Sequence, residues 1–210
     1  MQVLTLPVGA FEENCYLVWQ DAPGVAAVID PGDKPEVILA ALAERELKLT
    51  HILLTHGHFD HFLAAPALQK ATGAPVYIHG ADKQSLLNVR LPLGVFLPEG
   101  YAPPEDVRAV ENGERLPAGP LVFTYRNTPG HTPGSCFIVC GDAIFSGDTL
   151  FAGDIGRTDL AEGDPVEMSR TLQAIAAWPG DFTVYPGHEE ATTLAQEQAH
   201  NPYLRPPFRP

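Results

Sequence analysis

The sequence predicts an α/β fold for this 210-residue chain, and three observations support the prediction. Apolar runs typical of strands alternate with segments of helical periodicity. Side chains that can bind metals follow several of the strand-like runs, and open α/β sheets place their ligands at strand ends. No Ser/Gly linker, charge block or repeat divides the chain, so we expect residues 1–210 to form one domain.

Apolar and β-branched runs predict the strands of the first half, and apolar positions at helical spacing predict its helices. Residues 91–105 contain four Pro and two Gly, which predict no regular element. They form either a loop over a functional site or an ordinary surface connection. The strands are expected near residues 2–8, 15–20, 24–30, 51–55 and 75–79, and the helices near residues 35–47, 60–72 and 81–88.

The second half repeats the order of strands before helices, with the same kinds of signal. This pattern does not indicate how the sheets stack. The strands are expected near residues 121–127, 135–140, 143–146 and 182–185, and the helices near residues 164–177 and 189–199.

Composition excludes several classes of partner. The net charge is −13, from 13 basic and 26 acidic residues, and such a chain would repel a nucleic-acid backbone. No apolar run approaches the roughly 20 residues that a membrane helix needs. The N-terminus begins directly as a strand without a basic region, so we expect a cytoplasmic protein.

The three cysteines are predicted to be buried small apolar residues without chemistry. Cys136 and Cys140 lie on one expected strand, which places their Cα atoms roughly 13 Å apart at about 3.3 Å per residue. That separation exceeds the roughly 7 Å limit for a disulfide. Cysteines that form no disulfide are consistent with a reducing compartment.

The most informative motif is Thr-His-Gly-His-Phe-Asp-His at residues 55–61, which follows an apolar run. Imidazole and carboxylate together suit divalent first-row metals. A lone His at a strand end is more often structural, but three His and one Asp at this density predict a metal site. His56 and His58 point to one side of an extended loop, whereas Asp60 and His61 are shifted along the following turn. Two adjacent metals explain that division better than one.

Three more ligand candidates lie downstream. His131 is held between Pro-Gly turns in Thr-Pro-Gly-His-Thr-Pro-Gly at residues 128–134. Asp148 and His188 each follow an apolar strand and a Gly. Four strand ends therefore offer metal-binding side chains, as expected at the ligand edge of an α/β sheet.

These motifs resemble the metallo-β-lactamase-fold hydrolases, and within them the glyoxalase II-like group, over nearly the whole chain. Residues 14–18 and 28–32 are similar to the opening hairpin of that superfamily, and residues 151–160 resemble the segment after its bridging aspartate. The resemblance implies an αββα four-layer sandwich of metallo-β-lactamase type, with the metals at one sheet edge.

The resemblance also implies two divalent metal ions, with Zn as the first expectation and Fe or Mn as alternatives. True metallo-β-lactamases usually have a Cys where this chain has Asp148, which argues against antibiotic hydrolysis. The implied ligands are His56, His58 and His131 for the first metal, Asp60, His61 and His188 for the second, and Asp148 as the bridge.

Seven ligands shared by two metals leave open positions, and each metal lowers the pKa of a bound water from about 15.7 toward about 7. The expected nucleophile is therefore a hydroxide. The resemblance implies a thioesterase acting on small S-lactoylglutathione-like substrates, with Asp60 as the catalytic group that holds and shuttles the proton. Ser146 lacks a Gly-x-Ser-x-Gly setting and is expected to be structural.

Groups around the ligands have less specific signals. Asp30 either accepts a hydrogen bond from a ligating imidazole or initiates a turn. Arg157 and Asp159 are expected to form a structural ion pair, with substrate contact as the alternative. His79 ends a strand without a matching partner and is expected to be structural.

Two other functions compete with hydrolysis. His56, His58 and Asp148 alone would make the two-His, one-carboxylate triad of an iron persulfide dioxygenase of the same fold. Alternatively, the metals are structural, although structural sites are saturated by protein ligands and this one is not. The Pro-Gly-His-Glu sequence at residues 186–189 looks more like the hydrolases, which favours the thioesterase.

The C-terminal tail bears on substrate binding. Glyoxalase II resembles this chain in its metal core but has a longer helical C-terminal region, whose basic residues bind glutathione. Only 22 residues follow His188 here, and their cations are Arg205 and Arg209. We expect a flexible tail and weak binding of the glutathione part.

Overall fold

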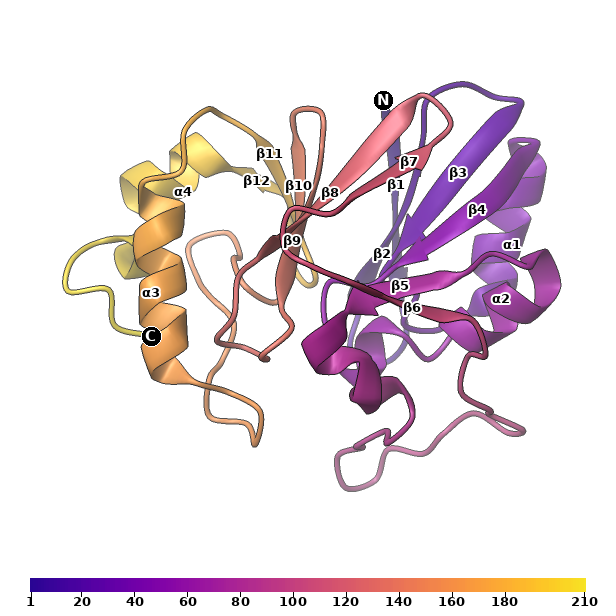
Figure 1. Cartoon of the computed structure of the whole chain (residues 1–210), viewed down its shortest axis with the longest axis horizontal. Helices are drawn as coiled ribbons and strands as arrows, with labels where there is room; N and C mark the ends of the chain where they lie inside the picture. The colour runs from indigo at the N-terminus through magenta and orange to yellow at the C-terminus, as the bar shows by residue number, and fades with distance from the viewer.

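The computed structural model describes residues 1–210 and contains two six-stranded mixed sheets that face each other (Figure 1). The first sheet has the strand order β1-β2-β3-β4-β5-β6 and the second has the order β12-β11-β10-β9-β8-β7. The first comprises β1 (Gln2–Val8), β2 (Glu13–Trp19), β3 (Gly24–Ile29), β4 (Leu47–Leu53), β5 (Val76–His79) and β6 (Val107–Val110). The second comprises β7 (Arg115–Ala118), β8 (Leu121–Asn127), β9 (Cys136–Cys140), β10 (Ala143–Gly147), β11 (Thr183–Pro186) and β12 (Thr192–Thr193).

Helices cover the outer face of each sheet, so the expected αββα four-layer sandwich is confirmed (Figure 1). Helices α1 (Pro35–Glu44) and α2 (Ala65–Thr72) pack on the first sheet, and α3 (Pro165–Ala176) and α4 (Leu194–His200) pack on the second. Neighbouring residues of a strand face opposite layers. On β4, for example, Ile52 is buried beneath the helices whereas Leu53 is buried between the sheets.

The predicted elements of the first half differ from the structure mainly at helix starts. The helix expected at 60–72 begins at Ala65, because Phe59–His61 forms the 3₁₀ turn η1. The segment expected as a helix at 81–88 is the 3₁₀ helix η2 (Gly80–Leu86). The strand expected at 51–55 is β4, which begins four residues earlier.

In the second half, the prediction missed three short strands. β6 and β7 are partly exposed and four residues long, and β7 carries Pro117 on the edge of its sheet, where a strand tolerates the missing N–H. β12 pairs with β11, so the helix expected at 189–199 begins only at Leu194. The remaining strands and α3 match the expected positions to within about two residues.

Residues 91–105 contain no helix or strand, as predicted. Residues 98–106 line a cavity of about 710 Å³ together with α2, so this part of the segment lies beside the outer helix layer. This part of the segment is therefore a surface connection beside α2.

The tail after α4 is ordered against the second sheet's helix layer, contrary to the expectation of a flexible end. It includes the 3₁₀ turn η3 (Pro202–Leu204), and Phe208 packs with the apolar cluster beneath α3. The Ser169 hydroxyl donates to the Phe208 carbonyl, and the Arg205 guanidinium donates to the Ala199 carbonyl. No helix of the chain has the length and apolarity needed to cross a membrane.

All three cysteines are buried and unpaired, as predicted.

Candidate metal centre

The seven predicted ligands come from loops at one edge of the two sheets. His56, His58, Asp60 and His61 follow β4, and the other three follow β8, β10 and β11. The structure brings six of these side chains together in two groups of three, and the seventh, Asp148, lies beside both. The first group contains His56, His58 and His131, and the second contains Asp60, His61 and His188.

The three imidazoles of the first group converge on one another. His58 Nδ1 lies 3.1 Å from His56 Nε2 and 2.8 Å from His131 Nε2. Facing nitrogens at these distances compete for protons unless a cation lies between them, and three imidazoles are a common ligand set for a first-row metal.

Asp148 joins the two groups. Its Oδ2 lies 3.5 Å from His131 Nε2 in the first group and 3.7 Å from His188 Nε2 in the second. Its Oδ1 lies 3.3 Å from His61 Nε2. His188 Nε2 is also 3.6 Å from Asp60 Oδ2. The Asp148 carboxylate thus faces both groups, with Oδ2 near one imidazole of each and Oδ1 near His61, which is consistent with the bridging role implied by the resemblance.

Four of the five imidazoles are held through the ring nitrogen that faces away from the cluster. His131 Nδ1 pairs with the Arg157 carbonyl at 2.8 Å, and His188 Nδ1 pairs with the Phe11 carbonyl at 3.2 Å. The other two partners are Thr55 Oγ1, 3.0 Å from His56 Nδ1, and Asp30 Oδ2, 3.1 Å from His61 Nδ1. These contacts leave Nε2 of each ring free for a ligand, the arrangement found around most protein-bound metals.

Two further observations indicate that this set of donors fits divalent cations. His61 Nε2 and Asp148 Oδ1 are buried without hydrogen-bond partners, and such atoms are rare unless an ion or water satisfies them. The space beside them is kept open by Gly187, where a Cβ would lie 2.3 Å from Asp148 Oδ1 and 2.6 Å from His61 Cε1.

Burial and mutual charge shift the pKa values of these groups in opposite directions. Burial and the neighbouring His131 and His61 lower the pKa of His58 to about 4. Burial opposes protonation of His61, but Asp148 and Asp30 raise its pKa well above the usual range. Burial likewise opposes ionisation of Asp60, yet the adjacent His188 and the charge of His61 lower the pKa of its carboxyl.

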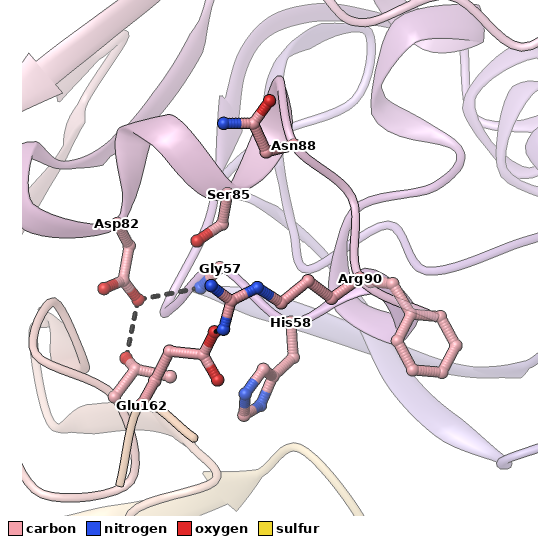
Figure 2. A pocket seen from close by; sticks show the side chains of 9 residues that line it. Gly57, His58, Asp82, Ser85, Asn88, Arg90 and Glu162 are labelled. Carbon is pink, nitrogen blue, oxygen red and sulfur yellow. Dashed lines mark hydrogen bonds and ion pairs between the residues drawn. The ribbon is translucent and has the colours of Figure 1, made fainter. Parts of the chain in front are cut away.

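Asp82 is a site residue that the sequence did not indicate. Its carboxylate is only 2% exposed and accepts from the Gly57 N–H at 2.9 Å (Figure 2). It also accepts from the Thr132 hydroxyl at 2.6 Å and the Gly134 N–H at 2.7 Å. Gly57 separates His56 from His58, and Thr132 follows His131. Asp82 therefore ties together the two loops that form the first group.

Glu13, on β2, was also missed. It is 1% exposed, neither carboxylate oxygen has a hydrogen-bond partner, and Oε1 lies 3.7 Å from His61 Nδ1. Burial raises the pKa of Glu13 well above its usual range, and Asp30 and Asp60 reinforce the shift against the opposing charge of His61. No periodicity or turn signal distinguishes either acid, because their partners are distant in the sequence.

The structure is consistent with both interpretations of Asp30, as an acceptor for a ligating imidazole and as a turn residue. Its Oδ2 contacts the His61 ring as above, and it also accepts from the Thr55 N–H at 2.8 Å and the Thr55 hydroxyl at 2.6 Å. Its φ of 48° places it in a left-handed turn.

Arg157 donates two hydrogen bonds to Asp159, at 2.6 and 2.8 Å, consistent with the structural pair. His79 pairs with Asn127 and accepts from the Ala81 N–H, consistent with a structural role.

Comparison with known proteins is consistent with this centre. A model of the metallo-beta-lactamase superfamily matches residues 8–197. Hydroxyacylglutathione hydrolase GloC of Haemophilus influenzae is 34% identical over 217 residues, covering 97% of this chain and 98% of that protein. A hydroxyacylglutathione hydrolase of Shewanella baltica is 35% identical over 183 residues, covering 87% of this chain but 64% of that protein.

Three solved structures are similar over almost the whole chain. The BLEG-1 B3 metallo-beta-lactamase has a TM-score of 0.84 and 32% identity, covering 97% of this chain and 99% of that one. TTHA1623 in a di-iron-bound form has a TM-score of 0.83 and 38% identity, covering 96% and 100%. ETHE1 from Myxococcus xanthus has a TM-score of 0.79 and 31% identity, covering 97% and 84%.

Proposed function

Because the chain belongs to the metallo-β-lactamase superfamily, we propose that it is a dinuclear metal-dependent hydrolase, resembling glyoxalase II, that cleaves S-lactoylglutathione-like thioesters. The observation that carries the proposal is the position of Asp148 between two complete groups of donors. A single ion would bind only one of the two groups of donors and would leave the other without a metal.

The proposed ligands are the two groups described above with Asp148 shared between them. Two divalent cations bound there would lower the pKa of a coordinated water toward about 7 and supply a nucleophile at neutral pH. Zn is the first expectation. Iron stays a candidate, which the di-iron form of TTHA1623 supports.

Asp60 is proposed as the group that orients and accepts the proton of the attacking water. The low pKa of its carboxyl keeps it ionised at neutral pH, so it can accept a proton. His188 Nε2, 3.6 Å from Asp60 Oδ2, restrains its position. The lowered pKa of His58 keeps that imidazole neutral near pH 7, as a ligand must be.

The second candidate is an iron persulfide dioxygenase of the same fold, and the iron bound by TTHA1623 favours testing it. Its expected triad was His56, His58 and Asp148. A mononuclear triad does not use the second group of donors, of which His61 and His188 lie within 4 Å of Asp148, and the presence of this group supports the hydrolase.

The test is to prepare the protein anaerobically, load it separately with Zn, Fe and Mn, and assay three reactions. These are hydrolysis of S-lactoylglutathione, oxygen uptake with a glutathione persulfide, and hydrolysis of a β-lactam. We expect thioester hydrolysis to dominate and to be lost in Asp148→Asn. Dominant oxygen uptake by the iron form would replace this function with the dioxygenase, and dominant β-lactam cleavage would replace it with a lactamase.

A further inference from the structure

A small polar cavity adjoins the first group of histidines. Its volume is about 40 Å³, and His58 forms part of its wall. Ser85, Asn88 and Arg90 line it from η2 and the residues that follow, and Glu162 lines it from the loop before α3 (Figure 2). We call this cavity the Arg90 pocket. It shares His58 with the proposed metal centre, so a ligand in it lies next to the reacting group.

Arg90 and Glu162 form an ion pair across the mouth of the pocket, in which Arg90 Nη1 donates to Glu162 Oε1. The two side chains are 73% and 28% exposed. Exposed ion pairs contribute little net stability, because water solvates the separated charges well. A ligand that satisfies both charges can therefore replace the pairing at little cost.

The pocket presents the Arg90 cation, the Glu162 anion and two neutral polar groups, the Ser85 hydroxyl and the Asn88 amide. A second acid, Asp82, also lines it, but its carboxylate already accepts hydrogen bonds from Gly57, Thr132 and Gly134. A ligand with only a carboxylate would separate Arg90 from Glu162 and leave the glutamate unpaired. A ligand with only an ammonium would leave the arginine unpaired. An α-amino carboxylate carries both charges on one carbon and can pair with each residue at once.

The size of the pocket sets a second limit. A buried water needs about 10–15 Å³ on the same measure, so the pocket holds roughly three waters. That space suits a small end group and not a whole substrate. Of the two cations of the tail, Arg205 donates to the Ala199 carbonyl within α4.

We propose that the Arg90 pocket binds an α-amino carboxylate at the end of the thiol part of the substrate. This inference rests on the proposed function for the position of the thioester at the metal centre. Within S-lactoylglutathione, the γ-glutamyl residue carries such a group. Arg90 binds its carboxylate, Glu162 binds its ammonium, and the neutral groups complete the hydrogen bonds.

The first test compares two thioesters in the metal-loaded enzyme, S-lactoylglutathione and the same compound acetylated on its α-amino group. The measured quantity is kcat/KM for S-lactoylglutathione divided by kcat/KM for the acetylated compound. A variant that loses some folded protein or some metal loses both values equally, so the ratio does not change. We expect the ratio to favour the free amine in the unmodified protein and to fall about fivefold in Glu162→Gln, for the loss of one ion pair. Arg90→Gln should raise KM for both thioesters, because both keep the carboxylate.

The matched control is Arg170→Gln, which removes the same charge from an exposed Arg–Glu pair on α3, outside the metal centre. It should leave the ratio unchanged. A ratio near one in the unmodified protein, or a ratio that Glu162→Gln does not alter, would overturn the inference while leaving thioester hydrolysis in place.

The second test measures binding without turnover. Calorimetric titration of metal-loaded protein with S-methylglutathione, which cannot be hydrolysed, should show binding that weakens about fivefold in Arg90→Gln and in Glu162→Gln. If no thioester is cleaved but this dependence is found, the proposed function is wrong and the pocket stands. Absence of binding, or equal affinity in all three proteins, would refute the pocket.

Discussion

Asp148 Oδ1 and His61 Nε2 lie 3.3 Å apart without forming a hydrogen bond, and neither atom has another partner. Two buried polar atoms that face each other in this way are costly unless a third species satisfies both. The hydrogen bond from His61 to Asp30 fixes the ring on its other side, so the imidazole cannot turn away. The protein holds these two atoms ready for a cation.

Fully loaded protein should contain two metal ions per chain, because Asp148 serves two groups of donors. Elemental analysis after dialysis measures this, and a crystal structure should place the ions about 3.5 Å apart. Asp148→Asn should retain fewer ions, since the amide is a weaker ligand. Finding no more than one equivalent in the unmodified protein after full loading would exclude a dinuclear centre.

Asp60→Asn should keep the fold and lose turnover by roughly 10²–10⁴-fold, the usual scale for a missing general base. The amide cannot accept a proton and binds a metal less well. The measurement is kcat at full metal occupancy. Asp106→Asn is the matched control, since Asp106 is an exposed acid that pairs with Arg108 outside the centre. Unchanged turnover of Asp60→Asn with metal bound would remove the proposed proton role.

Asp82→Asn should weaken metal binding about 10–100-fold, the scale for losing a residue that positions ligands. The carboxylate accepts three hydrogen bonds, and an amide must turn its NH₂ toward one of those donors. The free energy of unfolding should fall by about 1–3 kcal/mol. Competition with a chromogenic chelator measures the affinity. An unchanged affinity together with lowered stability would show that Asp82 supports only the fold.

The contribution of His58 and His61 to the stability of the metal-free protein should be largest near pH 6.5. Between pH 4 and 6.5, His58 binds a proton in the unfolded chain but not in the folded protein, where its pKa is about 4. The free energy of unfolding therefore rises with pH over this range. Above it, folded His61 keeps a proton that the unfolded residue has lost, so stability falls as pH passes through the raised pKa.

Denaturant titrations in a chelator at several pH values test this dependence. His61→Gln should flatten the decline above pH 6.5 and only reduce the rise below it, since burial and His131 still lower the pKa of His58. A decline of the same size in His61→Gln would assign it to other groups, such as His188, whose pKa the hydrogen bond with Asp60 raises despite burial.

The sequence predicted the seven clustered side chains because each of them follows a strand, most after a Gly, and strand ends meet at one sheet edge. It did not predict Asp82, Glu13 or the pair of Arg90 with Glu162. These residues are defined by partners 25 to 72 positions away, such as Gly57 for Asp82, and no local pattern marks such contacts.

Among the elements, long buried strands such as β8 carry a clear alternation of burial and were predicted within a residue. The strands β6 and β12 are short and half exposed, so their apolar signal is too weak. The start of α2 was predicted too early, because residues 59–61 form the 3₁₀ turn η1 and α2 begins only at Ala65, with Pro66 in its first turn, where helix starts favour proline.

Gly187→Ala should abolish activity and weaken metal binding, because the added Cβ would lie 2.3 Å from Asp148 Oδ1, where the metals are proposed to bind. Gly80→Ala is the matched control. Gly80 also lies beside a strand-end histidine, but a Cβ there would make only ordinary contacts, with Glu111 Oε1 at 3.5 Å and Ala109 Cβ at 3.9 Å. Neither glycine has a positive φ, so backbone strain does not separate the two variants. Metal content, circular dichroism and thioesterase turnover measured together distinguish a filled site from an unfolded protein. If Gly187→Ala binds two metals and turns over normally, the cations do not occupy the space beside Asp148 Oδ1 and His61, and the proposed ligand set is wrong.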